Sequence, residues 1–343
     1  MTAVRRRSGG SAERAAVRDE LAEVWTRVLS VRPGPDDTFT DLGGSSVQVE
    51  EAIAHSRGHL IAPLVTADFT GDPTLDEQAG RVARRYRAGF GAGDTALQQL
   101  RPGAAPAVFC FAGAGATAAW YLPLVAALAA APGTARGVYG LQAHGLQSRA
   151  RAAWSVTGAA RRHRRAITGV QPAGPYVLVG HSFGGIVALA TAEALRRRGH
   201  RIAQVVLLDT VVDSDLALAR WAPEQEGFSG ATAGSRLPRP LRLLGDRARA
   251  AGAGLVRYDP VRQKELFWAL GMRAQRRYRI GDCAQVSVLL TADAPGQAAL
   301  WQELGVPETR IHQVPGGHLS MAAEPAVADR LASIVTAALR GEY

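Results

Sequence analysis

The chain has 343 residues, of which 47% are hydrophobic, so it is long enough to form two domains with buried cores. Its formal net charge of +10 comes almost entirely from arginine, because Lys264 is the only lysine. The arginines are scattered rather than gathered in a basic stripe with interleaved aromatic residues, which argues against a nucleic-acid-binding protein.

The composition also argues against a membrane or secreted protein. No apolar run approaches the roughly eighteen residues of a membrane helix, and the basic residues 1–10 lack the apolar core of a signal peptide. The two cysteines, Cys110 and Cys283, lie in strand-like segments and show no metal-ligand spacing. We therefore expect a cytoplasmic protein with buried thiols, no metal site and no membrane contact.

Residues 11–86 form the first predicted domain, which follows the basic tail and is helical. Apolar side chains recur at helical spacing between residues 17 and 29, and further helices are expected from residue 46 and over residues 75–83. The apolar positions of the first helix are Val17, Leu21, Val24, Trp25, Val28 and Leu29.

Ser46 lies at the predicted start of the second helix, directly after Gly-Gly-Ser. A serine at a helix N-terminus is exposed, and the unpaired N–H groups and the helix dipole favour a phosphate there. A flexible glycine-serine linker is the alternative interpretation. Phe39 and Leu42 before the glycines and a periodic helix after them favour a functional serine.

Residues 87–105 are rich in glycine and include Pro102, a composition typical of a mobile tether to the second domain, residues 106–343. Such a tether would hold a group carried on the first domain at high concentration near a fixed active site. The second domain opens with a predicted strand, residues 107–111, and a loop of small residues, 112–116. Small residues let the backbone approach a tetrahedral intermediate closely, so we expect Ala114 to donate an N–H to an oxyanion hole.

The sequence GHSFG at residues 180–184 has the form G-x-S-x-G and separates a strand-like apolar run from a helix-forming one. This pattern in this context is the nucleophile elbow of α/β-hydrolases, in which the turn is too sharp for side chains beside the serine. We expect Ser182 to be a catalytic nucleophile and the N–H of Phe183 to be the other oxyanion donor. An ordinary glycine-rich turn is the alternative.

A serine nucleophile needs an acid and a general base, which follow it in α/β-hydrolases in the order Asp or Glu, then His. Asp209 ends the β-branched run at 202–208, which reads as the next parallel strand. His318 lies on the loop that leaves the predicted strand 310–314. Active groups gather at the carboxyl ends of strands in a doubly wound sheet, so these residues are the predicted triad partners of Ser182.

Four other residues compete for these roles. Asp293 also ends a strand-like run between Ser182 and the last histidines, and it is the alternative acid. His312 is expected to be a strand residue fixed by local packing, and His181 is expected to point away from Ser182. His144, in a glycine-flanked loop, is expected at the surface or at the rim of the site.

These observations predict an α/β-hydrolase, that is, a doubly wound and mostly parallel sheet. Residues 211–275 interrupt the α/β pattern after the acid-bearing strand. Such an insertion is typical of a lid over a substrate pocket, and we expect it to be partly helical and mobile.

At the level of motifs the chain resembles two known families. Residues 39–46 (FTDLGGSS) resemble the core motif of the peptidyl carrier domains of nonribosomal peptide synthetases, and residues 68–75 resemble that family's entry to its last helix. Residues 100–103, 138–143 and 171–176, which lead to the elbow, resemble the terminal type I thioesterase of the same synthetases.

The resemblance implies a small four-helix-bundle carrier domain over residues 11–86, with 4'-phosphopantetheine attached to Ser46. The sequence departs from the carrier motif at Ser45, where a charged residue is usual, and at Val47, where leucine is usual. In the thioesterase family the acid follows the strand after the elbow, which favours Asp209 over Asp293.

The function implied is chain release: an acyl or peptidyl thioester is transferred to Ser182 and released by hydrolysis or macrocyclisation. The implied partners are upstream synthetase modules with a condensation domain and a phosphopantetheinyl transferase. A free-standing serine esterase or lipase with a non-carrier helical module is one alternative. A non-enzymatic carrier or docking protein is another, although the intact Ser182, Asp209 and His318 argue against it.

Overall fold

Two units make up the chain, Met1–Gly93 and Asp94–Tyr343. The computed structural model describes residues 4–56, 64–87, 96–130, 136–147, 150–212, 252–256, 260–281, 283, 285–293 and 296–342. None of the helices described there combines the length and the apolar character needed to cross a membrane.

The first unit is helical, and aromatic rings join its elements. The Phe39 ring packs edge-on against Trp25 and Phe69, with ring centroids 5.0 and 5.2 Å apart. The buried indole N–H of Trp25 donates to Gln78 Oε1 at 3.0 Å, so burial leaves it with a partner. The elements are α1 (Val4–Leu29), α2 (Ser46–Ser56), the 3-10 helix η1 (Thr66–Phe69) and α3 (Leu75–Arg87).

Helix α1 begins earlier than the sequence predicts. The predicted tail spans residues 1–10, but residues 4–10 belong to the helix. Adding a residue to a helix that is already formed costs far less than starting one. A helix whose later turns are fixed by Trp25 and its neighbours therefore extends backwards into the basic segment.

The second unit is built on a seven-stranded sheet in the order β1-β3-β2-β4-β5-β6-β7. Strand β1 runs antiparallel to β3 and the other neighbouring pairs are parallel, which confirms the predicted mostly parallel α/β sheet. The chain steps outward to one side from β2 and to the other from β4, so these two strands flank the switch point where such sheets place their sites. The strands are β1 (Leu97–Arg101), β2 (Ala104–Phe111), β3 (Arg136–Leu141), β4 (Tyr176–His181), β5 (Ile202–Leu208), β6 (Val286–Leu290) and β7 (Ile311–Gln313).

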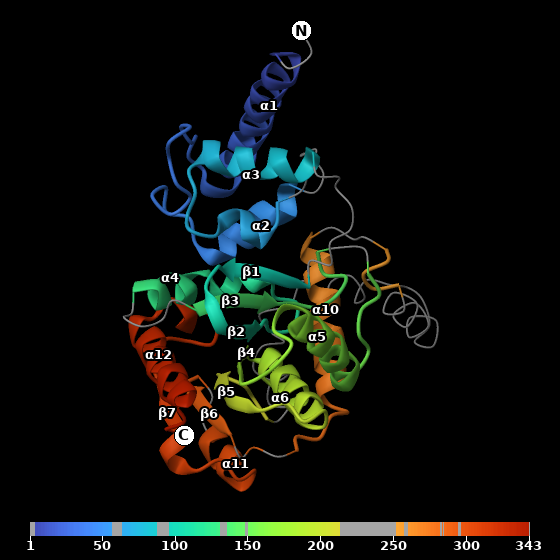
Figure 1. Ribbon diagram of the computed structural model, residues 1–343, viewed down its shortest axis with the longest axis vertical. Coiled ribbons are helices and arrows are strands. Elements are labelled where there is room, and N and C mark those ends of the chain that lie inside the picture. Colours follow the sequence, from blue (N-terminus) through green and yellow to red (C-terminus); the bar gives the residue numbers. More distant parts are fainter. Residues whose placement is uncertain are drawn as a thin grey trace, which may run out of the picture. The chain divides into compact units, whose positions relative to one another are not determined.

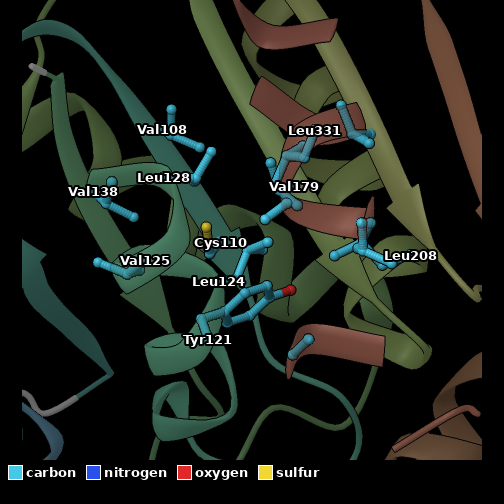
Figure 2. Packing of buried hydrophobic residues seen from close by; sticks show 14 of the residues in the cluster. Val108, Cys110, Tyr121, Leu124, Val125, Leu128, Val138, Val179, Leu208 and Leu331 are labelled. Carbon is cyan, nitrogen blue, oxygen red and sulfur yellow. The ribbon is translucent and has the colours of Figure 1, made fainter. Parts of the chain in front are cut away.

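Helices cover both faces of this sheet, with α4 and α12 on one face and α5 and α6 on the other (Figure 1). Alternate residues of a strand point to opposite faces, so Val108 and Val179 enter one core while Phe109 and Leu178 enter the other. Figure 2 shows the first core, where strand side chains meet those of α4 and α12. The helices are α4 (Leu122–Ala130), α5 (Val156–Val170), α6 (Phe183–Arg196), α10 (Pro260–Gln275), α11 (Gln297–Glu303) and α12 (Pro325–Arg340).

Strand β1 corrects the predicted linker, residues 87–105. Its last part is not a tether, because residues 97–101 pair with β3 and residues 104–105 already belong to β2. The sequence Leu-Gln-Gln-Leu-Arg has no β-branched residue and so carries no strand signal. It is a strand because the edge of β3 offers it hydrogen bonds, and Leu100 is buried against the sheet. Residues 88–95 lie outside the described part of the chain.

Only part of the predicted lid, residues 211–275, belongs to the described residues, since 213–251 and 257–259 lie outside them. Helix α10 bears out the expected helical character at the end of this segment. A Cβ built on Gly115 would lie 2.4 Å from the carbonyl oxygen of Lys264. The backbone of α10 therefore packs directly on the loop after β2. Both cysteines are buried thiols, as predicted.

A first prediction follows from the packing of α6 on β2. A Cβ on Gly184 would lie 2.1 Å from the carbonyl oxygen of Phe111, so alanine at this position must push the helix away from the strand. We expect Gly184→Ala to lower the free energy of unfolding by about 1–3 kcal/mol, measured by urea unfolding with circular dichroism.

The matched control is Gly169→Ala near the end of α5, where a Cβ would meet no atom within 4 Å. Alanine is a better helix former than glycine, so this variant should gain about 0.5–1 kcal/mol. Equal stability of the two variants would contradict the close approach of α6 and β2.

Candidate active site

Ser182 lies at the sharp turn between β4 and α6. Its backbone angles are φ 52° and ψ −129°, in a region that residues other than glycine rarely adopt. A Cβ on Gly180 would lie 2.4 Å from Cα of Gly185, so the turn has no space for side chains there. The N–H of Ser182 donates to the carbonyl oxygen of Leu208 at 3.0 Å. The expected elbow is therefore present, and it is tied to the neighbouring strand.

Asp209 directly follows β5, and its side chain is fully buried. It also has a positive φ, 46°, which turns its carboxylate towards the end of the sheet. Its Oδ1 accepts the N–H of Thr291 at 2.9 Å, and its own N–H donates to the carbonyl oxygen of Leu289 at 2.8 Å. These bonds fix one carboxylate oxygen and leave Oδ2 for another donor.

His318 completes a chain of hydrogen bonds across the ends of the strands. Its Nδ1 lies 2.7 Å from Asp209 Oδ2, and its Nε2 lies 3.1 Å from Ser182 Oγ. Since a carboxylate can only accept, Nδ1 carries the proton and Nε2 is free to receive one from the serine. The structure therefore brings the three predicted residues together in the order that a Ser-His-Asp triad requires.

Asp293, the alternative acid, is also beside His318 but contacts a different group. Its Oδ2 accepts the backbone N–H of His318 at 3.0 Å. The imidazole is thus held by Asp209, and the backbone of the same residue is held by Asp293. The sequence offers the two carboxylates only as alternatives, because no spacing rule distinguishes a side-chain contact from a backbone contact.

The two expected oxyanion donors lie next to Ser182. Phe183 is the first residue of α6, so its N–H has no acceptor within the helix. A Cβ on Gly113 would lie 3.4 Å from Ser182 Cβ, which shows how closely the loop bearing Ala114 passes the serine. A Cβ on Gly271 of α10 would meet Ala114 and the Phe183 ring at 2.8 and 3.3 Å. Ala114 and Phe183 thus share one wall, and their role as donors stays a prediction.

A pocket continues from this wall between α5, α6 and α10, and His144 and His163 line it. The sequence predicts His144 at the surface or at the rim of the site; it lines the pocket, but it is buried and not at the surface, and its ring centroid lies 5.3 Å from that of His163. The surface alternative is wrong because other backbone segments pack on the glycine-flanked loop: a Cβ on Gly145 would lie 2.1 Å from the carbonyl oxygen of Ala150 and 2.8 Å from Cα of Gly254. The other lining residues include Phe111, Gly113, Ala114, Phe183, Leu270 and Gly271.

Two further histidines compete with His318 in the sequence, His312 and His181. His312 lies in β7 and is partly buried. His181 makes its hydrogen bond to the carbonyl oxygen of His318, with Nε2 2.8 Å from that oxygen. Burial lowers the pKa of His181 well below its usual value, and the neighbouring His318 adds to this effect.

In the first unit, the structure distinguishes Ser45 from Ser46. Ser45 caps helix α2: its Oγ accepts the N–H of Gln48 at 3.4 Å, and Gln48 Oε1 accepts the N–H of Ser45 at 3.0 Å. Ser46 is the first residue of the helix, is half-buried, and makes no side-chain hydrogen bond to another described residue. The side chain of the next residue, Val47, is 57% exposed. Ser45 is thus engaged in capping the helix, whereas the Ser46 hydroxyl is not.

The sheet, the elbow and the hydrogen-bonded Ser182 and His318 are those of an α/β-hydrolase. The thioesterase domain family matches residues 106–339, and the chain belongs to that family.

Its relatives include large synthetases. The chain is 32% identical over 201 residues to malpinin synthetase of Mortierella alpina, covering 58% of this chain and 2% of that protein. It is 31% identical over 222 residues to the dimodular nonribosomal peptide synthase of Bacillus subtilis (strain 168), covering 63% of this chain and 9% of that protein. The chain therefore spans less than a tenth of either relative.

Among solved structures, a holo four-domain nonribosomal peptide synthetase bound to AMP and glycine matches 93% of this chain and 26% of its own, with a TM-score of 0.55 and 22% identity. At this identity the likeness concerns the fold alone.

The two carboxylates give the second prediction. In Asp209→Asn the amide offers N–H groups to Nδ1 and favours the wrong tautomer of His318, so we expect kcat to fall by about 10⁴-fold. In Asp293→Asn the amide oxygen can still accept the N–H of His318, and we expect a loss of less than about tenfold, the cost of weakening one hydrogen bond. The measurement is turnover of a p-nitrophenyl acyl ester. Similar losses in both variants would refute the assignment of Asp209 as the acid.

The buried His181 gives a third prediction, on the pH dependence of stability. Its pKa is lowered in the folded protein, so unfolding takes up a proton once the pH falls below about 6.5, the usual pKa of histidine. The stabilising contribution is complete above that pH and declines below it, by up to about 1.4 kcal/mol per pH unit. His181→Gln should remove this component, so urea unfolding between pH 7 and pH 5 should show a flatter dependence than in the wild type. Parallel curves would refute the lowered pKa.

Proposed function

We propose that this chain releases a carrier-bound acyl or peptidyl chain in nonribosomal peptide biosynthesis, by transfer to Ser182 and then hydrolysis or macrocyclisation. The observation that carries the proposal is the hydrogen-bonded series Ser182, His318 and Asp209 in a domain of the thioesterase family. The similarity to nonribosomal peptide synthetases supports the substrate class. Upstream synthetase modules with a condensation domain are the proposed source of the chain.

The residues around Ser46 fit 4'-phosphopantetheine. The Ser46 hydroxyl is not used in capping, it lies at a helix N-terminus that favours a phosphate, and the exposed Val47 borders it. A Cβ on Gly44 would lie 2.2 Å from the Phe39 ring, so the glycine lets the loop before the serine close over the aromatic core. When bound, the group presents the acyl chain as a thioester. A phosphopantetheinyl transferase is the partner that would attach it.

The chemistry of the second unit follows from its geometry. Ser182 Oγ attacks the thioester carbonyl carbon while His318 Nε2 accepts its proton. The N–H groups of Ala114 and Phe183 stabilise the negative charge that forms on the carbonyl oxygen, and one such donor is typically worth about 10²–10³ in kcat. Asp209 stabilises the imidazolium. The C–S bond then breaks, and the leaving thiolate takes the proton from His318.

The second half of the reaction reuses the same groups. Water, or an amine or hydroxyl of the bound chain, attacks the ester carbonyl on Ser182 and gives its proton to His318. The C–O bond to the serine breaks, and Ser182 recovers a proton from the imidazolium. Water yields a free acid, whereas an internal nucleophile yields a macrocycle.

The fourth prediction tests both halves of the proposal by intact-protein mass. With coenzyme A and a broad-specificity phosphopantetheinyl transferase, the wild type and Ser45→Ala should gain the mass of one phosphopantetheine group, and Ser46→Ala should not. Ser45→Ala is the matched control, because it loses only the helix cap, worth about 1 kcal/mol. With an acylated coenzyme A, the wild type should release the acyl group and Ser182→Ala should retain it.

Two outcomes would overturn parts of the proposal. Absence of a mass gain in the wild type would refute a carrier at Ser46 and favour a serine esterase with a helical appendage. Equal release by the wild type and Ser182→Ala would refute Ser182 as the nucleophile.

A further inference from the structure

The loop that carries His318 is held through its backbone by three side chains from distant parts of the second unit. Asp293 accepts the N–H of His318 at 3.0 Å. The Nε2 atom of His181 lies 2.8 Å from the carbonyl oxygen of His318. Trp120 Nε1 donates to the carbonyl oxygen of the next residue, Leu319, at 3.0 Å. The backbone is thus fixed on both sides of the imidazole that contacts Ser182.

The contact between His181 and His318 determines which nitrogen of His181 is protonated. A carbonyl oxygen can only accept, so Nε2 of His181 must carry the hydrogen. Its Nδ1 is buried and has no hydrogen-bond partner among the described residues, so a proton there would be a buried donor without an acceptor. Burial also lowers the pKa of this imidazole, which agrees with a neutral ring. His181 is therefore a neutral donor with a single favourable tautomer.

The His181 ring is fixed between two neighbours. The Trp120 indole stacks on it with centroids 3.7 Å apart and an interplanar angle of 15°. At its edge, a Cβ on Gly113 would lie 3.3 Å from Nδ1, so the loop after β2 leaves this nitrogen little space. Trp120 itself belongs to a short 3-10 helix, Ala118–Tyr121, which follows that loop. The loop of the expected oxyanion donor Ala114 and the loop of His318 are thus both in contact with His181.

We propose that His181 is a positioning residue for the reaction: its Nε2–H holds the His318 carbonyl and thereby keeps the His318 imidazole within reach of Ser182 Oγ. The proposal rests on the proposed function in that Ser182 and His318 must perform the chemistry. The hydrogen bond of His181 is to the His318 backbone, and His181 is not among the residues that line the pocket beside Ser182. Its effect is expected on kcat and not on KM, because it fixes the base and leaves the pocket unchanged.

The fifth prediction compares two nearly isosteric variants, His181→Gln and His181→Met. A glutamine amide nitrogen can occupy the position of Nε2 and donate to the His318 carbonyl, whereas the methionine methyl group cannot. Removing the donor from a buried carbonyl should lower kcat by about 10–100-fold. We expect this loss in the methionine variant, recovery of most of it in the glutamine variant, and little change of KM in either.

The probes are a p-nitrophenyl acyl ester for turnover and a fluorophosphonate that labels the reactive serine. Expressing kcat per labelled serine removes any difference in the folded fraction. Equal kcat per labelled site in the two variants would overturn the proposal. A failure of the wild type to be labelled, or labelling that persists in Ser182→Ala, would instead refute the proposed nucleophile.

A further variant covers the case in which the methionine variant does not fold. His181→Asn keeps a polar side chain, but its amide ends one atom short of the Nε2 position. It should show the same loss of kcat relative to His181→Gln. Equal kcat of the asparagine and glutamine variants would overturn the proposal in the same way.

Discussion

The site depends on two backbone turns at the ends of adjacent strands. Strands β4 and β5 pair in parallel and end with His181 opposite Leu208. The residue directly after each strand, Ser182 after β4 and Asp209 after β5, has a positive φ. A non-glycine residue held in a sparsely populated backbone region typically costs about 1–3 kcal/mol. Backbone hydrogen bonds from Ser182 to β5 and from Asp209 to β6 hold both turns. These two turns therefore place the side chains of the nucleophile and the acid at the same end of the sheet, beyond the last paired residues of β4 and β5.

The sequence predicted this edge because it follows from local rules. A G-x-S-x-G between an apolar strand and an apolar helix identifies Ser182, and the rule that parallel strands bring their carboxyl ends together identifies Asp209. His318 follows from chain order and from its place after β7. The contacts that support these residues were not predictable. His181 and Asp293 reach the His318 backbone across 137 and 25 positions, and no motif encodes such distances.

The errors in the predicted fold also have physical causes. Strand β1 has no β-branched residue and exists because β3 offers it an edge, so its stability is tertiary and not local. His144 lies in a loop whose composition suggests the surface, yet it is buried, and the backbones of Ala150 and Gly254 pack closely on the neighbouring Gly145. In the first unit, the motif placed Ser46 correctly at a helix start. The motif alone does not distinguish the roles of the Ser45 and Ser46 hydroxyl groups. The hydrogen bonds between Ser45 and Gln48, which only the structure shows, make that distinction.

Helix α10 is coupled to the loop of the expected oxyanion donor through backbone contacts. The carbonyl oxygen of Lys264 lies against Gly115, and Gly271 lies against Ala114 and the Phe183 ring. At Gly115 the atom in contact is a backbone oxygen of α10. A backbone atom cannot move aside by a change of side-chain rotamer. Because protein interiors are close-packed, a displacement of α10 towards the loop would have to move Ala114 or Phe183. Helix α10 ends the segment that the sequence predicts as a lid. A shift of α10 therefore acts on the same wall that borders Ser182.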